Sequence, residues 1–227
     1  PAKVQSALLE AMQERQVTIG KQTFRLPDPF LVLATQNPIE SEGTYPLPEA
    51  QVDRFLFKVV ITYPSFHEEM QVVERVTAEV PPEVQQVITG QELLRFQRIA
   101  DSVYVDPRVM EYAVTLGHAT RPGSGDGLKD LSKYVSYGAS PRASVNLILG
   151  AKALALLRGR EYALPEDVRD LAPEVLRHRL VLSYEALAQD VTPDQIVSRV
   201  LERLPPPRIH LGDPHGDTRA SLETPRV

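Results

Sequence analysis

The stretch Phe30-Leu31-Val32-Leu33-Ala34-Thr35-Gln36-Asn37-Pro38 decides the fold class of this 227-residue chain. Its apolar part is short and continuous, which favours a strand buried on both faces, as in a parallel sheet. A second run of this kind spans residues 56–63. Ser65, with Glu68 after it, then predicts a capped helix to about Ala78. Strand, helix and strand in alternation predict an α/β layer.

Upstream of this stretch the pattern changes twice. Pro1 to Arg15 carries apolar residues at helical spacing and predicts an amphipathic helix. Gln16 to Leu26 is rich in β-branched and aromatic residues on both sides of Gly20-Lys21, which predicts a β-hairpin. Because the chain begins directly in a helical pattern, and its α/β part has few strands for a sheet, we expect it to be part of a larger protein.

Downstream of Pro81-Pro82 the sequence predicts helices only. A glycine-containing loop is expected from Arg121 to Tyr137. In the second helix of this part we expect one apolar set to point inward, namely Val109, Met110, Ala113, Val114 and Leu116. The predicted helices span residues 90–103, 107–120, 141–158, 165–178 and 193–204.

These patterns divide the chain into three parts. Residues 1–84 are expected to form an α/β piece, and residues 85–205 a helical domain. Residues 206–227 are polar, rich in turn formers and without periodicity, and they predict a flexible tail. The fold class predicted is therefore α/β plus all-α.

Composition excludes several classes of protein. The net charge of -5 argues against a general nucleic-acid binder, which needs a basic face. The chain has no cysteine, which excludes a disulfide or thiolate site and fits a reducing, cytoplasmic location. No run reaches the roughly 18 apolar residues of a membrane helix, and no signal peptide opens the chain. The five histidines have no metal-ligand spacing, so no metal site is predicted.

The first candidate site residue is Asn37, at the end of the apolar run. The carboxyl ends of strands in open α/β sheets are where ligands bind. An amide side chain both donates and accepts hydrogen bonds, so Asn37 is suited to orient a water against a phosphate. The alternative is that Asn37 only makes the turn before Pro38.

The second candidate is Arg54, in Pro48-Glu49-Ala50-Gln51-Val52-Asp53-Arg54-Phe55. Residues 50–55 predict a short helix before the second buried strand. The planar guanidinium of arginine matches phosphate with paired, charge-assisted hydrogen bonds. The alternative is a surface arginine paired with Asp53 or Glu49.

The third candidate is Arg142, in Gly138-Ala139-Ser140-Pro141-Arg142-Ala143. Ser140 is the expected N-cap, and Pro141 suits the first helical turn. Free N–H groups and the helix dipole favour an anion at this helix start. The alternative is a solvated arginine on a helix start, although a cation in the first turn conflicts mildly with the helix dipole.

These three motifs, in this order, resemble the MoxR family of AAA+ ATPases over about residues 1–204. The opening Pro-Ala-Lys-Val-Gln-Ser-Ala-Leu-Leu-Glu-Ala-Met-Gln-Glu-Arg-Gln-Val-Thr is similar to the family's helix after the Walker B strand. Ala-Thr-Gln-Asn-Pro resembles sensor 1, which points to Asn37. Pro-Glu-Ala-Gln-Val-Asp-Arg-Phe resembles the arginine-finger segment and points to Arg54, and Gly-Ala-Ser-Pro-Arg-Ala resembles sensor 2 and points to Arg142.

The resemblance implies a partial P-loop NTPase sheet followed by an α-helical lid. It implies ATP and Mg²⁺ in a homo-oligomeric ring, commonly a hexamer, and a von Willebrand factor A-type partner protein. Asn37 and Arg54 would serve catalysis, and Arg142 would sense the nucleotide. The chain departs from the family because it contains neither the Walker A loop nor the Walker B acidic pair, which would hold most of the ATP and Mg²⁺. We therefore expect the parent protein to hydrolyse ATP and this chain alone to be inactive.

Two other readings remain open at this stage. The helical part could be a non-catalytic interaction module that binds partner proteins without nucleotide. The chain could also belong to a DNA-linked relative, such as a clamp loader or helicase, since these share the sensor logic. The net charge of -5 speaks against the DNA-linked reading.

Overall fold

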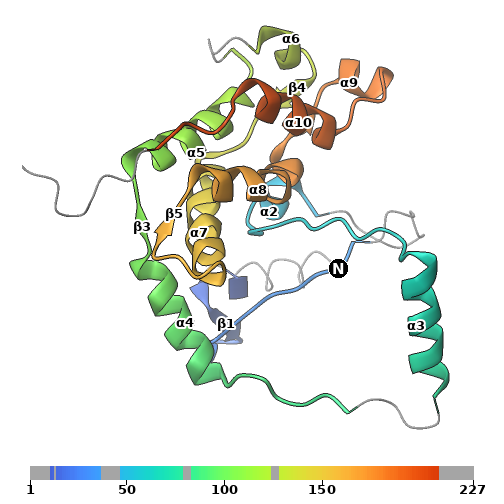
Figure 1. The fold of residues 1–227 in the computed structure, drawn as a ribbon, viewed down its shortest axis with the longest axis vertical. Helices are drawn as coiled ribbons and strands as arrows, with labels where there is room; N and C mark the ends of the chain where they lie inside the picture. Colours follow the sequence, from blue (N-terminus) through green and yellow to red (C-terminus); the bar gives the residue numbers. More distant parts are fainter. Residues whose placement is uncertain (1–10, 13, 37–46, 79–82, 124–127, 210–227) are drawn as a thin grey trace, which may run out of the picture.

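The computed structural model describes residues 11–12, 14–36, 47–78, 83–123 and 128–209. Most of the predicted opening helix, Asn37 and residues 210–227 of the predicted tail lie outside these ranges. Figure 1 shows a helical bundle, with a hairpin and α3 (Phe66–Thr77) standing apart from it. No helix among the described residues is long and apolar enough to cross a membrane.

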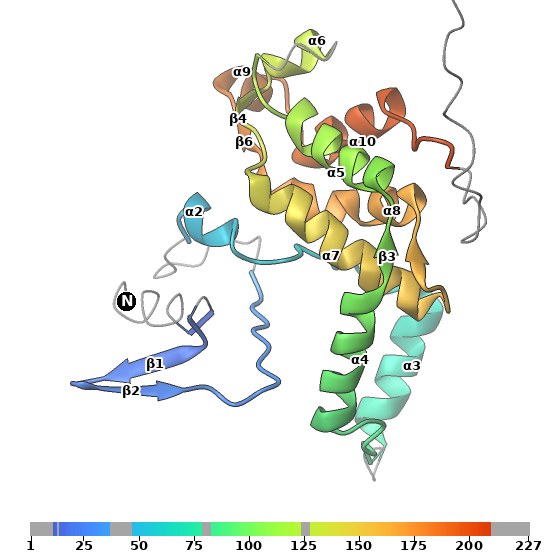
Figure 2. The ribbon, with the colours of Figure 1, turned by 90° about the vertical axis from the view of Figure 1, so that its left-hand side faces the viewer.

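The predicted hairpin is confirmed. Strands β1 (Gln16–Ile19) and β2 (Gln22–Arg25) pair antiparallel, with Ile19 opposite Gln22. The turn needs a residue with positive φ, and Gly20 supplies it at 65° without the steric cost of a side chain. Figure 2 shows the hairpin extending away from the bundle.

The two predicted buried strands are not formed. Residues 30–36 and 56–64 belong to no helix or strand, and Leu33 and Ile61 are largely exposed. A strand is stable only when neighbouring strands take up its backbone hydrogen bonds. Here the N–H of Lys58 donates to the carbonyl of Glu174 in a helix, 2.9 Å away, instead of to a strand. Both segments nevertheless have the apolar composition that is typical of strands in a sheet covered on both faces.

Helices on either side of the second segment precede the bundle, and capping signals in the sequence mark where the two longer ones begin. Helix α2 (Glu49–Val52) is the short helix expected before Arg54, and it ends sooner than predicted. At α3 the Ser65 hydroxyl accepts from the Glu68 N–H, and the Glu68 carboxylate accepts from the Ser65 N–H at 2.8 Å. Thr89 and Glu92 repeat this capping box at α4 (Gly90–Ser102). Neither α3 nor α4 has a buried residue.

Four helices form the core of the bundle. They are α5 (Pro107–Ala119), α7 (Pro141–Leu157), α8 (Pro165–Leu176) and α10 (Pro193–Arg203), and their contacts with one another enclose Leu116, Leu147, Leu176 and Ile196. Each begins with proline after its N-cap, as predicted.

The inward face predicted for α5 was wrong at two positions. Val109, Ala113 and Leu116 are fully buried, but Met110 and Val114 are exposed. Successive helical residues are rotated by about 100°, so 110 and 114 lie beside the buried stripe and not within it.

Several short elements were not predicted. Strands β3 (Tyr104–Val105) and β5 (Tyr162–Ala163) pair in parallel, and β4 (Val135–Tyr137) pairs antiparallel with β6 (Val181–Leu182). The predicted loop 121–137 therefore contains β4 as well as a short helix. Elements this short have no sequence period and depend on tertiary neighbours. The unpredicted helical pieces are α6 (Lys129–Ser132), η1 (Arg177–Arg179) and α9 (Tyr184–Ala188).

A buried carboxylate ties the end of α7 to the start of α8. Asp167 is fully buried and accepts from Arg160 at 2.6 and 2.8 Å and from Arg158 at 2.7 Å. The N–H of Leu164 also donates to it, 2.8 Å away. Burial pushes the pKa of Asp167 up, but these donors outweigh burial and hold the pKa below its usual value. This is a structural arginine–aspartate cluster within the lid.

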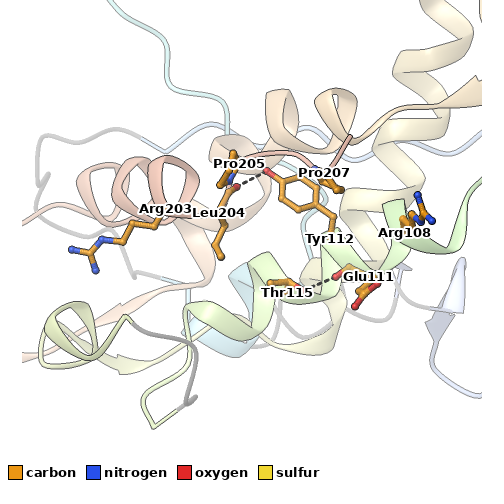
Figure 3. A pocket seen from close by; sticks show the side chains of 8 residues that line it. All are labelled: Arg108, Glu111, Tyr112, Thr115, Arg203, Leu204, Pro205 and Pro207. Atoms are coloured by element: carbon orange, nitrogen blue, oxygen red, sulfur yellow. Dashed lines mark hydrogen bonds between the residues drawn. The ribbon is translucent and has the colours of Figure 1, made fainter. Parts of the chain in front are cut away.

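The chain after α10 lies across α5. The Tyr112 hydroxyl donates to the Leu204 carbonyl, 3.0 Å away (Figure 3). An open pocket lies at this crossing. Its lining residues are Arg108, Glu111, Tyr112, Thr115, Arg203, Leu204, Pro205 and Pro207. Neither Arg54 nor Arg142 lines this pocket.

Candidate functional site

The predicted finger and lid motifs meet at Asp53. Asp53 caps the end of α2, and its carboxylate accepts from the Ser140 hydroxyl at 3.0 and 3.1 Å. The Arg142 guanidinium pairs with the same carboxylate at 3.1 Å. The Nε of Arg179, in η1, lies 3.1 Å from Oδ1 at an ion-pair distance, although it makes no aligned hydrogen bond. One carboxylate thus joins the predicted finger segment, residues 48–55, to two separate elements of the bundle.

The Asp53 carboxylate lies at the start of α7, where the sequence favours an anion. Ser140 is the N-cap as predicted, and its hydroxyl accepts from the N–H of Arg142 at 3.3 Å. The same hydroxyl donates its hydrogen to Asp53. The dipole of α7 favours negative charge at this end, so the helix start stabilises Asp53.

Arg142 lies where the sequence predicted, in the first turn of α7. Its side chain is half exposed (50%), and its partner Asp53 is 18% exposed. An ion pair this open to water contributes little stability, so Arg142 can exchange one anionic partner for another at small cost.

Arg54 makes no ion pair with a described residue, unlike Arg142 and Arg179. Its Nε and Nη1 atoms are buried, and neither has a hydrogen-bond partner among the described residues. The alternative reading, an arginine paired with Asp53 or Glu49, does not apply to these two nitrogens, because neither has such a partner, and the Asp53 carboxylate contacts Ser140, Arg142 and Arg179 instead. Leaving buried donors unpaired costs about 1–3 kcal/mol. Water, another subunit or a ligand would supply the acceptor that these two nitrogens lack.

Asn37 lies outside the described residues, so its geometry stays a prediction. Of the other two candidates, Arg142 is bound to Asp53, the residue that precedes Arg54 in the sequence.

Sequence reasoning missed Arg179, which is the most enclosed residue of the site. Its side chain has no exposed surface, and it donates to the carbonyls of Asp53 at 2.9 Å and Phe55 at 2.5 Å. Burial lowers the pKa of Arg179, while the charge of Asp53 opposes that shift. The only sequence signal is the basic triplet Arg177-His178-Arg179 after a helix, where cations suit the dipole of any helix.

His178 is held neutral beside Arg179. Its Nε2 lies 2.7 Å from Nη1 of Arg179 and 3.1 Å from the carbonyl of Phe55, and the tautomer decides which contact is a hydrogen bond. Burial and then the charge of Arg179 lower the pKa of His178 to about 4.

We expect His178 to make the protein less stable as the pH falls from 6.5 to about 4. In this window the unfolded chain has taken up a proton on His178 that the folded chain excludes, since the pKa shifts from 6.5 to about 4. The contribution is fully present above pH 6.5. The His178→Gln variant should therefore show a shallower fall in urea midpoint across this window, whereas His67→Gln on the exposed α3 should keep the parent slope. Equal slopes for parent and His178→Gln would contradict the assignment.

Comparison with known families places these features in one class. A family described as "ATPase family associated with various cellular activities (AAA)" matches residues 1–57, and one described as "AAA lid domain" matches residues 129–200. The chain is thus part of an AAA ATPase: a portion of the α/β core followed by a helical lid. This confirms the predicted fold class, although the two expected strands are extended chain here.

Individual relatives narrow the class. The chain is 51% identical over 210 residues to Chaperone MoxR1 of Mycobacterium tuberculosis, covering 92% of this chain and 55% of that protein. It is 32% identical to Protein MoxR of Methylorubrum extorquens, over 90% of this chain and 63% of the relative. The crystal structure of a candidate ATPase from Cytophaga hutchinsonii superposes with a TM-score of 0.87 at 45% identity, covering 92% of this chain and 63% of that one.

The chain belongs to the MoxR family of AAA ATPases and comprises the C-terminal AAA portion with the lid domain. It spans about half to two thirds of the length of these relatives (55% and 63% for the two curated proteins).

The family binds ATP with Mg²⁺, and the described residues fit part of that task. The buried, unpaired Nε and Nη1 of Arg54 suit a phosphate oxygen, which accepts charge-assisted hydrogen bonds. Among the described residues no group of three or more histidine, aspartate or glutamate side chains is placed to hold a metal ion.

Proposed function

We propose that this chain supplies the finger, the sensors and the lid of a ring-forming ATPase. In the complete protein, ATP hydrolysis at subunit interfaces would drive chaperone-like remodelling or assembly of partner proteins. The observation that carries the proposal is the pair of buried, unpartnered nitrogens on Arg54, next to an ion pair that ties its segment to the lid. The similarity to a protein named as a chaperone supports the client-directed role.

Each candidate residue has a distinct task in this proposal. Arg54 reaches the γ-phosphate of ATP held by a neighbouring subunit and stabilises the charge that develops in phosphoryl transfer. The Asn37 amide orients the attacking water. Arg142 exchanges Asp53 for a phosphate oxygen and so links nucleotide state to the position of the lid. Mg²⁺ neutralises phosphate charge and is held mainly by residues outside this chain.

The remaining assignments are proposals of the same kind. Residues 1–84 are assigned to the α/β core, 85–205 to the lid and 206–227 to a tail. The ring is proposed to be a homohexamer in the cytoplasm, with a von Willebrand factor A-type protein as partner. These assignments rest on the family resemblance and on the order of the motifs.

Activity that depends on assembly tests the proposal. We expect ATP hydrolysis per subunit of the full-length protein to rise with protein concentration, in step with the oligomer seen by mass photometry, because each finger serves a neighbour's ATP. Constant activity per subunit from monomer to ring would contradict a shared site. A partner-binding protein without any hydrolysis would favour the interaction module, and turnover stimulated by DNA would favour the DNA-linked relative.

A further inference from the structure

Arg179 binds the backbone of the finger segment, although it lies far from that segment in the sequence. Its Nη2 donates to the carbonyls of Asp53 and Phe55, and its Nη1 donates to Leu56 at 3.4 Å. A further bond from Nη1 to the carbonyl of Val175 fixes the guanidinium on α8. The bundle therefore holds the finger segment by its main chain.

These contacts bracket Arg54. The carbonyl of Asp53 belongs to the peptide that enters Arg54, and the carbonyl of Phe55 belongs to the second peptide after it. Peptide groups are planar, so fixing both carbonyls leaves the backbone of Arg54 few alternatives. The Arg54 side chain therefore starts from a fixed Cα, and the burial of its Nε and Nη1 restricts the rotamers it can adopt.

Stability alone gives weak reason for a buried cation here. Enclosing a charge costs several kcal/mol, which a single carboxylate often does not recover, and an apolar side chain would pack at lower cost. Arginine offers what an apolar residue lacks: a rigid planar fork whose donors reach several acceptors at once. In η1 that fork is used on the finger segment, the segment whose own arginine has unpaired donors.

We propose that Arg179 is a positioning residue for Arg54: it fixes the peptides on both sides of the finger so that the Arg54 guanidinium is held ready for the neighbouring subunit's phosphate. The inference rests on the proposed function, because it assigns Arg179 to the same reaction. Arg179 touches no reacting atom. Arg179 lies in η1 and also bonds to α8, and both elements belong to the lid. Its contacts therefore fix the position of the finger relative to the lid before nucleotide binds.

The effect of losing this contact should appear in kcat and not in nucleotide binding. Displacing a catalytic group by about 1 Å costs on the order of 10²-fold in rate. Arg179→Lys keeps a positive charge near Asp53 but cannot bridge the carbonyls of Asp53, Phe55 and Leu56. We therefore expect the full-length Arg179→Lys protein to lose about 10- to 100-fold in kcat with an unchanged KM for ATP.

A matched control separates positioning from general damage to a buried arginine. Arg160→Lys alters the arginine–aspartate cluster at Asp167 in the same lid, away from the finger segment. It is expected to lower the melting temperature about as much as Arg179→Lys while leaving kcat within twofold of the parent. Arg179→Gln removes the buried charge altogether and should repeat the loss in kcat.

A double-mutant cycle with Arg54→Ala decides the inference, measured in single turnovers with radiolabelled ATP so that slow hydrolysis can be followed. If Arg179 acts through Arg54, Arg179→Lys should change the rate less than twofold once Arg54 is alanine. An equal loss in both backgrounds, the same kcat loss in Arg160→Lys, a change confined to KM, or failure of both Arg179 variants to fold would overturn it. If Arg54→Ala alone keeps the parent rate, the proposed finger itself fails, which is a separate result.

Discussion

Arg54→Ala is expected to lower kcat for ATP hydrolysis by about 10³- to 10⁵-fold in the full-length protein, the range that arginine fingers contribute in phosphoryl transfer. The reason is that hydrolysis builds charge on the γ-phosphate, and a preorganised guanidinium stabilises it in a site that excludes water. Nucleotide affinity should change little, because in the proposed ring a different subunit holds most of this ATP.

The measurement pairs steady-state hydrolysis with nucleotide binding followed by a fluorescent ATP analogue. Arg203→Ala is a suitable control, since this exposed arginine pairs with Asp130 in α6, outside the Asp53 cluster, and should leave kcat within twofold. Turnover of Arg54→Ala at the parent level would remove the finger assignment. Loss of binding together with turnover would place Arg54 in the subunit's own pocket.

Asp53→Ala is expected to destabilise the lid junction by about 3–5 kcal/mol, the usual cost of removing one partner from a buried ion pair. It leaves the fully buried guanidinium of Arg179 without a nearby negative charge. Arg142→Ala removes the half-exposed member of the same cluster and should cost only about 0–1 kcal/mol. If Arg142 senses nucleotide, Arg142→Ala should nevertheless change ATP affinity.

Urea denaturation of the full-length variants, followed by circular dichroism, measures the difference, and nucleotide titration measures the affinity. Glu49→Ala, in the exposed first turn of α2, is the matched control and should keep the parent midpoint. Equal midpoints for Asp53→Ala and Glu49→Ala would show that Asp53 does not hold the junction. Unchanged affinity and rate in Arg142→Ala would remove its sensor role.

Local chemistry explains why the helix starts could be predicted. A capping residue and its proline lie next to each other in sequence, so Ser140-Pro141, Asp106-Pro107 and Thr192-Pro193 each mark a start that the structure confirms. The capping box of Ser65 and Glu68 is equally local. Such signals depend on no distant partner.

Features that depend on distant partners could not be read in this way. The apolar runs at 30–35 and 56–63 have the composition of strands, but a strand forms only where neighbours complete its hydrogen bonds. On α5, the apolar character of Met110 and Val114 does not show which edge of the apolar stripe faces the core, and both side chains are exposed.

The same distinction between local and long-range signals applies to the site residues. The position of Arg142 followed from its cap, but its pairing with Asp53 joins residues 89 positions apart, and no sequence period links them. Arg179 was missed because its acceptors in the finger segment are main-chain oxygens, which every residue carries. The buried, unpaired donors of Arg54 likewise appear only when the surrounding atoms are known.

The grip of Arg179 on carbonyl oxygens has a consequence for sequence variation. A bond to a main-chain oxygen is indifferent to the side chain attached to that residue. The side chains at positions 55 and 56 can therefore vary within the limits of their own packing, while the Arg179 guanidinium holds the backbone on the same path. Arg179 therefore constrains the path of the backbone at these positions but not the identity of their side chains.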